Sequence, residues 1–153
     1  MVDKADEMSG RLAGIATKAG KRLPMVRADR AIVSVEEGVS GDWRGKQKTR
    51  QVTVLFAEDW ARAVAELDPA TPWTVRRATL LVSGLVNPQQ AGGVLAIGQV
   101  RLKVTGETQP CVRMDEQLPG LWDAMRPDWR GGVTARVIAG GEIAVGDGVE
   151  WAE

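Results

Sequence analysis

The stretch that decides the fold lies near the C-terminal end and reads Val133-Thr134-Ala135-Arg136-Val137-Ile138-Ala139-Gly140-Gly141-Glu142-Ile143-Ala144-Val145. Its two ends are short runs rich in β-branched residues, which favour strands. The Gly140-Gly141 pair between them adopts positive φ angles without strain, so we expect a tight hairpin there. Gly146-Asp147-Gly148 turns the chain again before the run Val149-Glu150-Trp151. Short strands separated by glycine turns are typical of a barrel or sandwich.

Six further runs upstream have the composition of strands. They are Leu12–Ala16, Ala31–Val35, Gln51–Phe56, Leu80–Val82, Val94–Ile97 and Val100–Val104. The last alternates apolar and charged residues, as a strand with one solvated face does. Two helices are expected between the strands, Glu58–Leu67 with Trp60, Val64 and Leu67 on one face, and Pro119–Met125. We therefore predict a mainly β protein, a closed β-barrel with two or three short helices inserted.

Length and composition indicate one domain over residues 1–153. Hydrophobic residues make up 44% and charged residues 26%, which is ordinary for a globular protein. Lysine plus arginine equal aspartate plus glutamate at 20 each, so attraction to nucleic acid or to anionic membranes is not expected. No stretch approaches the ~20 apolar residues of a membrane span, and the N-terminus has no signal-peptide apolar region. A single cysteine cannot form an internal disulfide, so we expect a cytoplasmic protein.

Cys111 is the only cysteine in a chain that has no histidine. A Ser-His-Asp triad, a Cys-His pair and a His/Cys zinc site are therefore all excluded. A lone cysteine is most often a small buried hydrophobe. Cys111, however, follows Pro110 and lies two residues before Arg113, and this polar context favours an accessible thiol. Arg113 is close enough to stabilise a thiolate, which makes Cys111 the candidate for covalent or soft-metal chemistry.

Arginines form the second group of candidate site residues. The loop Gly41–Arg50 carries Arg44 and Arg50 and suits an oxyanion, although its spacing is not that of a P-loop and a solvated loop is the alternative. The pair Arg76-Arg77 precedes a strand and either binds an anion or pairs with surface carboxylates. No carboxylate cluster for a hard metal is visible. One thiol with dispersed arginines suggests sulfur handling or soft-metal ligation beside a phosphorylated ligand.

Read in order, these segments resemble the MOSC domain. This is the C-terminal domain of molybdenum cofactor sulfurases, and it also occurs as small stand-alone bacterial proteins. The resemblance covers about residues 10–151 and rests on Gly38–Asp42, Arg50–Leu55 with Glu58, Arg76–Leu85, Leu95–Gly98, Val104–Glu107, Pro110-Cys111 and Gly140–Asp147. Their order and spacing, with the cysteine after a Thr-Gly strand end, carry the likeness.

The resemblance implies a barrel like the β-barrel domain of pyruvate kinase and a bound molybdenum cofactor (molybdopterin). Cys111 is then similar to the family's functional cysteine, a sulfur (persulfide) carrier or a molybdenum ligand. The residues that the resemblance assigns to cofactor binding are Arg44, Arg50, Arg76, Arg77, Thr79 and Arg113. Two positions depart from the family pattern: Trp43 precedes Arg44 where a His or Arg commonly follows the Gly-Asp pair, and Thr79 stands where an Asn is common.

Three functions remain open from the sequence. The first is a molybdenum-cofactor-binding domain in which Cys111 is a molybdenum ligand or a sulfur carrier. The carrier would receive sulfur from a cysteine desulfurase-type donor, a pyridoxal phosphate-dependent sulfurase. The second is a molybdenum-dependent reductase of N-hydroxylated compounds, which needs an external electron-transfer protein because the chain has no Fe–S cysteine set and no flavin fingerprint. The third is a non-catalytic ligand-binding barrel with an inert Cys111. The oligomeric state is left open.

Overall fold

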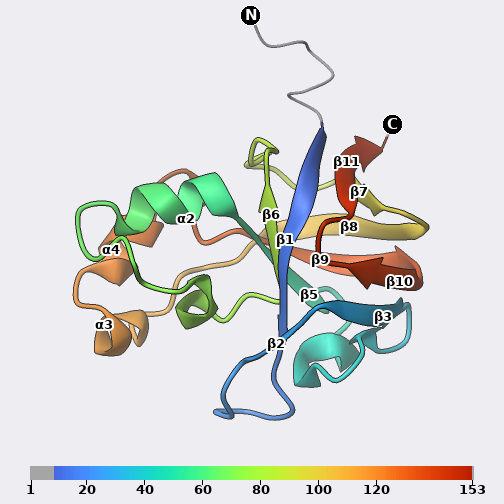
Figure 1. Ribbon diagram of the computed structural model, residues 1–153, viewed down its shortest axis with the longest axis horizontal. Coiled ribbons are helices and arrows are strands. Elements are labelled where there is room, and N and C mark those ends of the chain that lie inside the picture. Colours follow the sequence, from blue (N-terminus) through green and yellow to red (C-terminus); the bar gives the residue numbers. More distant parts are fainter. Residues whose placement is uncertain (1–8, 153) are drawn as a thin grey trace, which may run out of the picture.

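The computed structural model describes residues 9–152, and these form a closed β-barrel of seven strands (Figure 1). The strands are β1 (Ser9–Thr17), β5 (Val52–Phe56), β6 (Leu80–Ser83), β7 (Val94–Ile97), β8 (Val100–Glu107), β9 (Val133–Ala139) and β11 (Gly148–Ala152). They pair in the order β11-β7-β8-β9-β5-β6-β1, and pairing of β1 with β11 closes the barrel. A short strand, β2 (Val26–Ala28), extends the sheet beside β1. The predicted closed barrel is confirmed.

The barrel interior is filled by alternate side chains of its strands. On β8, Val100, Leu102 and Val104 are buried, while Arg101 and Lys103 between them are half-buried. This is the period-two pattern read from the sequence, and it points one face of the strand into the core. The same core holds the inward side chains of the other six strands. Burial of this apolar surface is the main stabilising contribution to the barrel.

A second, three-stranded sheet lies against the barrel and corrects the prediction of a tight hairpin at Gly140-Gly141. It consists of β10 (Gly141–Ala144), β3 (Arg30–Ser34) and β4 (Gly38–Val39). Strand β10 pairs with β3 and not with β9, and neither glycine has a positive φ. A Cβ at Gly140 would lie 2.5 Å from the Val33 carbonyl oxygen. The glycine therefore allows a close approach to β3 as the chain passes from one sheet to the other.

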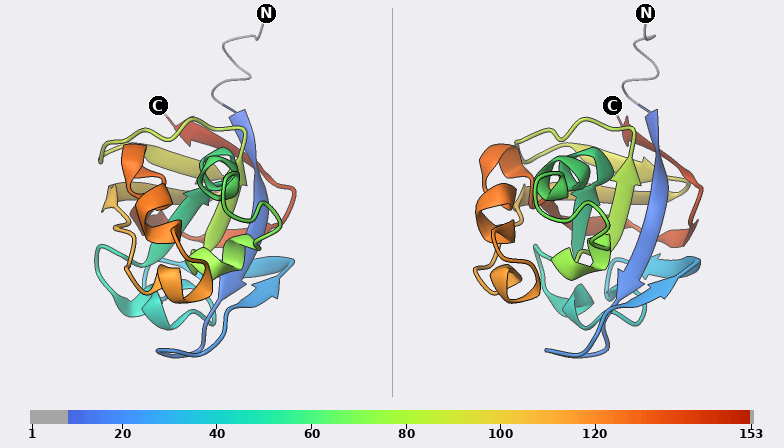
Figure 2. Two further views of the ribbon diagram at one scale, coloured as in Figure 1. Left: turned by 90° about the vertical axis from the view of Figure 1, so that its left-hand side faces the viewer. Right: turned by 60° about the vertical axis from the view of Figure 1, so that its left-hand side comes forward.

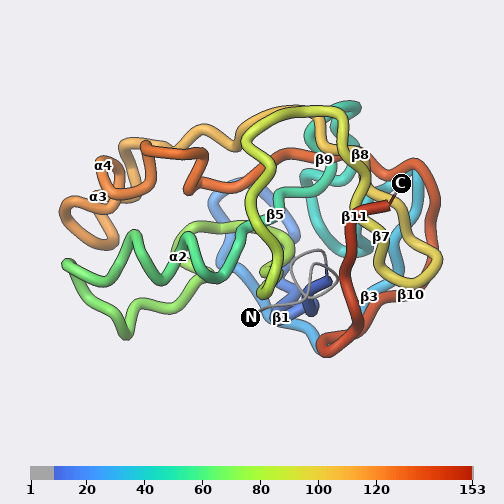
Figure 3. Tube along the Cα trace, turned by 90° about the horizontal axis from the view of Figure 1, so that it is seen from above, coloured from blue at the N-terminus to red at the C-terminus, as the bar shows by residue number. Residues whose placement is uncertain are grey.

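Three short α-helices lie together on one side of the barrel (Figure 3). They are α2 (Ala57–Val64), α3 (Met114–Gln117), which the sequence did not predict, and α4 (Leu121–Met125); the 3-10 turns are η1 (Trp43–Lys46), η2 (Trp73–Arg76) and η3 (Pro127–Trp129). Trp60 and Val64 of α2 are buried as expected, but Leu67 lies beyond the helix end and is exposed. A second apolar cluster joins the helices to Trp73 of η2. Within residues 9–152, every helix is too short or too polar to cross a membrane.

Four connecting segments gather at one end of the barrel (Figure 2). They are the β1–β2 loop, η1, η2 and the loop that leads from β8 into α3. Strand β1 runs from Ser9 at the opposite end of the barrel to Thr17 beside these segments (Figure 1). Ala152 also lies at that opposite end, because Glu150 of β11 pairs with Ser9. Segments that are distant along the chain therefore meet where one ligand can contact all of them.

Candidate functional site

A cavity of about 720 Å³ opens where these four segments meet. This volume lies in the range of ligand pockets, roughly 300–1,000 Å³. Its lining includes eight basic side chains: Lys18, Lys21, Arg22, Arg44, Arg50, Arg76, Arg77 and Arg113. Among the described residues that line it, Glu116 is the sole carboxylate. The chain as a whole has no net charge, so this concentration of cations makes a local positive field that suits an anionic ligand.

Cys111 lies on the wall of this cavity and is exposed. It stands in the loop between β8 and α3, where its carbonyl oxygen accepts a hydrogen bond of 2.9 Å from the Met114 amide at the start of the helix. The structure thus brings the thiol together with five of the six residues proposed for cofactor binding, and Thr79 is the exception. What these residues bind stays a prediction.

Arg76 is the most deeply buried cation of the cavity. Its Nε donates to the Gly131 carbonyl oxygen at 3.0 Å and its Nη2 to the Thr108 carbonyl oxygen at 3.2 Å. Within the described chain no carboxylate pairs with it. Burial, followed by the charge of Arg44, lowers the pKa of Arg76 to about 10, so the guanidinium is still protonated at neutral pH. A buried guanidinium without a carboxylate partner keeps an uncompensated positive charge, which attracts an anionic ligand.

Thr108 adds an unpartnered donor to the same wall. Its Oγ1 is buried and has no hydrogen-bond partner among the described residues. A buried hydroxyl without a partner costs about 1–3 kcal/mol. Together with Arg76, it fits an oxygen-rich anionic group entering the cavity, and a pterin phosphate is such a group.

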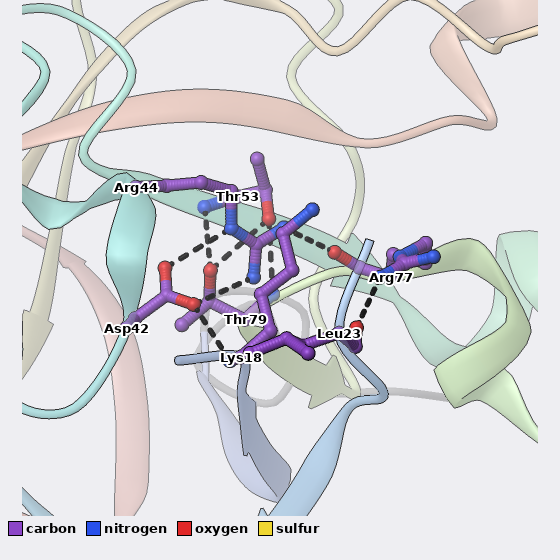
Figure 4. Close-up of polar contacts among 7 residues, drawn as sticks. All are labelled: Lys18, Leu23, Asp42, Arg44, Thr53, Arg77 and Thr79. Carbon is purple, nitrogen blue, oxygen red and sulfur yellow. Dashed lines mark hydrogen bonds and ion pairs between the residues drawn. The ribbon is translucent and has the colours of Figure 1, made fainter. Parts of the chain in front are cut away.

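A buried ion pair joins Asp42 to Arg44, a residue that lines the cavity (Figure 4). The carboxylate of Asp42 accepts hydrogen bonds from Arg44 Nε and Nη2, both at 3.0 Å, and from the Lys18 amide at 3.0 Å. Arg44 Nη1 also donates to the Arg77 carbonyl oxygen, and the Arg77 guanidinium donates to the Leu23 carbonyl oxygen. These bonds join the β1–β2 loop, η1 and the end of η2.

Thr79, which the resemblance assigns to cofactor binding, does not line this cavity. It is fully buried, and its Oγ1 is 3.1 Å from Thr53 Oγ1. The Thr79 amide also donates to Thr53 Oγ1 at 2.9 Å, and the Thr53 amide donates to Thr79 Oγ1 at 3.2 Å. The hydroxyl of Thr79 is therefore used inside the protein. Thr53, which does line the cavity, is held in place by it.

The β1–β2 loop contributes cations that the sequence did not single out. The five residues after β1 include three of the lining cations, Lys18, Lys21 and Arg22. This cluster of basic residues is visible in the sequence, but it matches no known binding motif. The pKa of Lys18 is lowered, first by burial and then by the charges of Arg44 and Arg77. Its Nζ lies 5.8 Å from the centre of the Trp43 ring, within range of a cation–π contact.

Fold and site together define a small β-barrel protein with a basic cavity and one accessible thiol. The chain belongs to the MOSC domain family, whose model matches residues 40–150. No match was found among curated proteins.

Solved structures show the same fold. The YuaD protein from Bacillus subtilis superposes with a TM-score of 0.79 at 17% identity, over 94% of this chain and 96% of that one. YiiM from Escherichia coli gives a TM-score of 0.68 at 19% identity, covering 94% of this chain and 70% of YiiM. YiiM from Geobacillus stearothermophilus gives 0.71 at 17% identity, with 94% and 75% covered.

Proposed function

We propose that the chain binds the molybdenum cofactor in the basic cavity, with Cys111 as the residue that meets its metal or its sulfur. The observation that carries this proposal is an exposed thiol on the wall of a cavity with eight cations. Membership of the MOSC domain family, which is associated with this cofactor, supports it. When bound, the cofactor supplies a molybdenum centre for atom-transfer chemistry.

Arg50 and Arg113 are the side chains best placed to hold the phosphate of the pterin. Both line the cavity, and neither side chain makes a hydrogen bond or an ion pair within the described part of the chain. Their planar guanidinium groups therefore keep all their donors for a ligand, and such groups bind phosphate oxygens in pairs. Arg76 and Thr108 offer further donors on the deeper wall.

Two roles of Cys111 are consistent with this position. As a thiolate, it is a soft ligand that suits molybdenum. As a sulfur carrier, its thiolate attacks the terminal sulfur of a persulfide on a cysteine desulfurase-type donor. The donor's S–S bond then breaks, the donor leaves as a thiolate, and Cys111 holds the new S–S bond.

An alternative use of the same site is the reduction of N-hydroxylated compounds, with electrons from an external electron-transfer protein. The exposure of Cys111 favours an external partner in either case, because the reacting group lies where another protein can approach it. A non-catalytic ligand-binding barrel is the third outcome to be tested.

The test is metal analysis and native mass spectrometry of protein made in a cofactor-competent host. We expect wild-type protein to carry molybdenum and the pterin, and an Arg50→Ala/Arg113→Ala double variant to lose both. Arg30→Ala is the control, since Arg30 lies on β3, is exposed and does not line the cavity.

A Cys111→Ala variant distinguishes the two roles proposed for this cysteine. Loss of molybdenum supports ligation, and loss of the mass of one sulfur atom with molybdenum retained supports the carrier. Wild-type protein with neither metal nor extra sulfur would leave only the non-catalytic barrel.

A further inference from the structure

We propose that Asp42 is a positioning residue of the cavity. Through Arg44 it holds together the two segments that bring cations to the cavity from separate parts of the chain, the β1–β2 loop and the end of η2. This inference rests on the proposed function in one respect: the effect of Asp42 on the cations is measured as the affinity of the cavity for an anion.

Asp42 is fixed on every side. Its side chain is completely buried. The carboxylate accepts three hydrogen bonds of 3.0 Å, two from Arg44 and one from the Lys18 amide. Its backbone is held as well, because its amide donates to the Val39 carbonyl oxygen at 3.0 Å and its carbonyl accepts from the Gly45 amide at 3.1 Å. A buried carboxylate with these bonds sets the geometry of its partners and does not adapt to them.

Arg44 uses its guanidinium on the protein. Nε and Nη2 bind Asp42, Nη1 binds the Arg77 carbonyl oxygen, and the side chain is only 12% exposed. Arg50 and Arg113 make no such bonds within the described residues and stay available to a ligand. In this proposal Arg44 does not bind the cofactor directly but positions the segments that carry the other cations.

The hydrogen bonds that begin at the Lys18 amide in the β1–β2 loop return to the same loop at Leu23. Arg77 has a left-handed backbone, with φ of 65°, which a residue other than glycine adopts only when its surroundings hold it. The Arg44 guanidinium binds its carbonyl oxygen, and the Arg77 guanidinium in turn binds the Leu23 carbonyl oxygen (Figure 4). Asp42 thus acts on the β1–β2 loop at both Lys18 and Leu23. Lys21 and Arg22, which line the cavity, lie between these two points.

The direction in which anion affinity changes when Asp42 is neutralised distinguishes a positioning role from a purely electrostatic effect of its charge. Asp42 is a negative charge close to a basic cavity, so by Coulomb's law its neutralisation strengthens the binding of an anion. If Asp42 positions the cations, the same neutralisation weakens binding, because Lys18, Arg44 and Arg77 lose their common anchor. Glu116, the carboxylate of the cavity lining, is the matched control, and its neutralisation strengthens binding under either view.

The experiment measures pyrophosphate affinity by titration calorimetry at low ionic strength. We expect Glu116→Gln to bind more tightly than wild type. Asp42→Asn should bind about tenfold more weakly, and Arg44→Lys should be similarly weakened although its charge is kept. The Asp42→Asn/Arg44→Lys double variant should be no weaker than the worse single variant, since both changes break one network. Arg44→Lys keeps the experiment decisive if Asp42→Asn does not fold.

A second measurement does not depend on binding. Trypsin cleavage after Lys18, Lys21 and Arg22 under native conditions should be faster in Asp42→Asn or Arg44→Lys than in wild type, and unchanged in Glu116→Gln. Wild-type protein that binds no pyrophosphate would overturn the proposed function, while faster cleavage in the variants would still support the positioning role. Cleavage at the wild-type rate in the folded variants, or an Asp42→Asn variant that binds pyrophosphate more tightly than wild type, would overturn the positioning role.

Discussion

The guanidinium of Arg76 donates a hydrogen bond of 3.2 Å to the carbonyl oxygen of Thr108, three residues before Cys111. A second bond from the same side chain reaches Gly131 at 3.0 Å. Arg76 of η2 is thereby attached to the segment that carries the thiol. The buried cation and Cys111 are held on one wall of the cavity by the same contacts.

Replacing Arg76 with lysine tests this attachment. The charge is kept, but an ammonium group cannot bond both carbonyl oxygens in the fork geometry of a guanidinium. We expect a loss of about 1–3 kcal/mol in the free energy of unfolding, because a buried carbonyl is left unpaired. Pyrophosphate binding should weaken as well. Denaturant titration and calorimetry measure the two effects, and Arg30→Lys on the exposed face should change neither.

Replacing Cys111 with serine should separate chemistry from stability. Because Cys111 is exposed, the free energy of unfolding should change by no more than about 0.5 kcal/mol. A hydroxyl is neither a soft ligand nor able to hold a persulfide, so sulfur transfer or molybdenum retention should be lost. Thermal melting is measured beside molybdenum and sulfane-sulfur content. A much lower melting temperature would show that Cys111 is a packing residue.

Replacing Lys18 with methionine should stabilise the ligand-free protein and weaken anion binding. Burial, Arg44 and Arg77 lower the pKa of Lys18, so the folded state binds the proton less tightly than the unfolded chain does. At neutral pH Lys18 is therefore unfavourable for folding, and this penalty disappears as the pH rises past the ordinary value of 10.5. The stability gain of Lys18→Met should accordingly shrink as the pH rises towards 10.5, as denaturant titrations at several pH values would show. A gain that does not vary with pH would contradict this cause.

Replacing Gly132 with alanine should damage the barrel next to the cavity. Gly132 has a φ of 98°, and a Cβ there would lie 2.2 Å from the Val54 carbonyl oxygen of β5. We expect a loss of about 2 kcal/mol or more in the free energy of unfolding, from backbone strain and from this clash. Gly148→Ala is the control, because a Cβ there meets no atom within 4 Å. Equal effects of the two changes in denaturant titration would show that the close contact is unimportant.

Most strands could be predicted because they bury one face in the barrel core. Such strands show an alternation of apolar and polar residues and are rich in β-branched residues, and both patterns are visible in the sequence. β2 and β4 were missed because strands of three and two residues carry no periodic pattern. The error at Gly140 has a different cause. A glycine pair serves equally for a tight turn and for a close approach of two backbones, and only the position of Val33 decides between them.

The site was predictable where one residue type stands out and not where it depends on tertiary packing. Cys111 and the arginines could be chosen on their chemistry. The Asp42–Arg44 pair could not be recognised, because the burial of both side chains arises from segments far away in the sequence. The burial of Thr79 could not be foreseen for the same reason, since its hydroxyl meets that of Thr53 on β5, 26 residues earlier in the chain.

The pairing of β1 with β11 places Ser9 opposite Glu150, at the barrel end away from the cavity (Figure 1). A fluorescent domain or a surface tether attached close to Ser9 or Ala152 would therefore sit at a distance from Cys111. Either attachment leaves the thiol open to a second protein, so the proposed association with a sulfur donor or an electron donor can be tested on an immobilised chain.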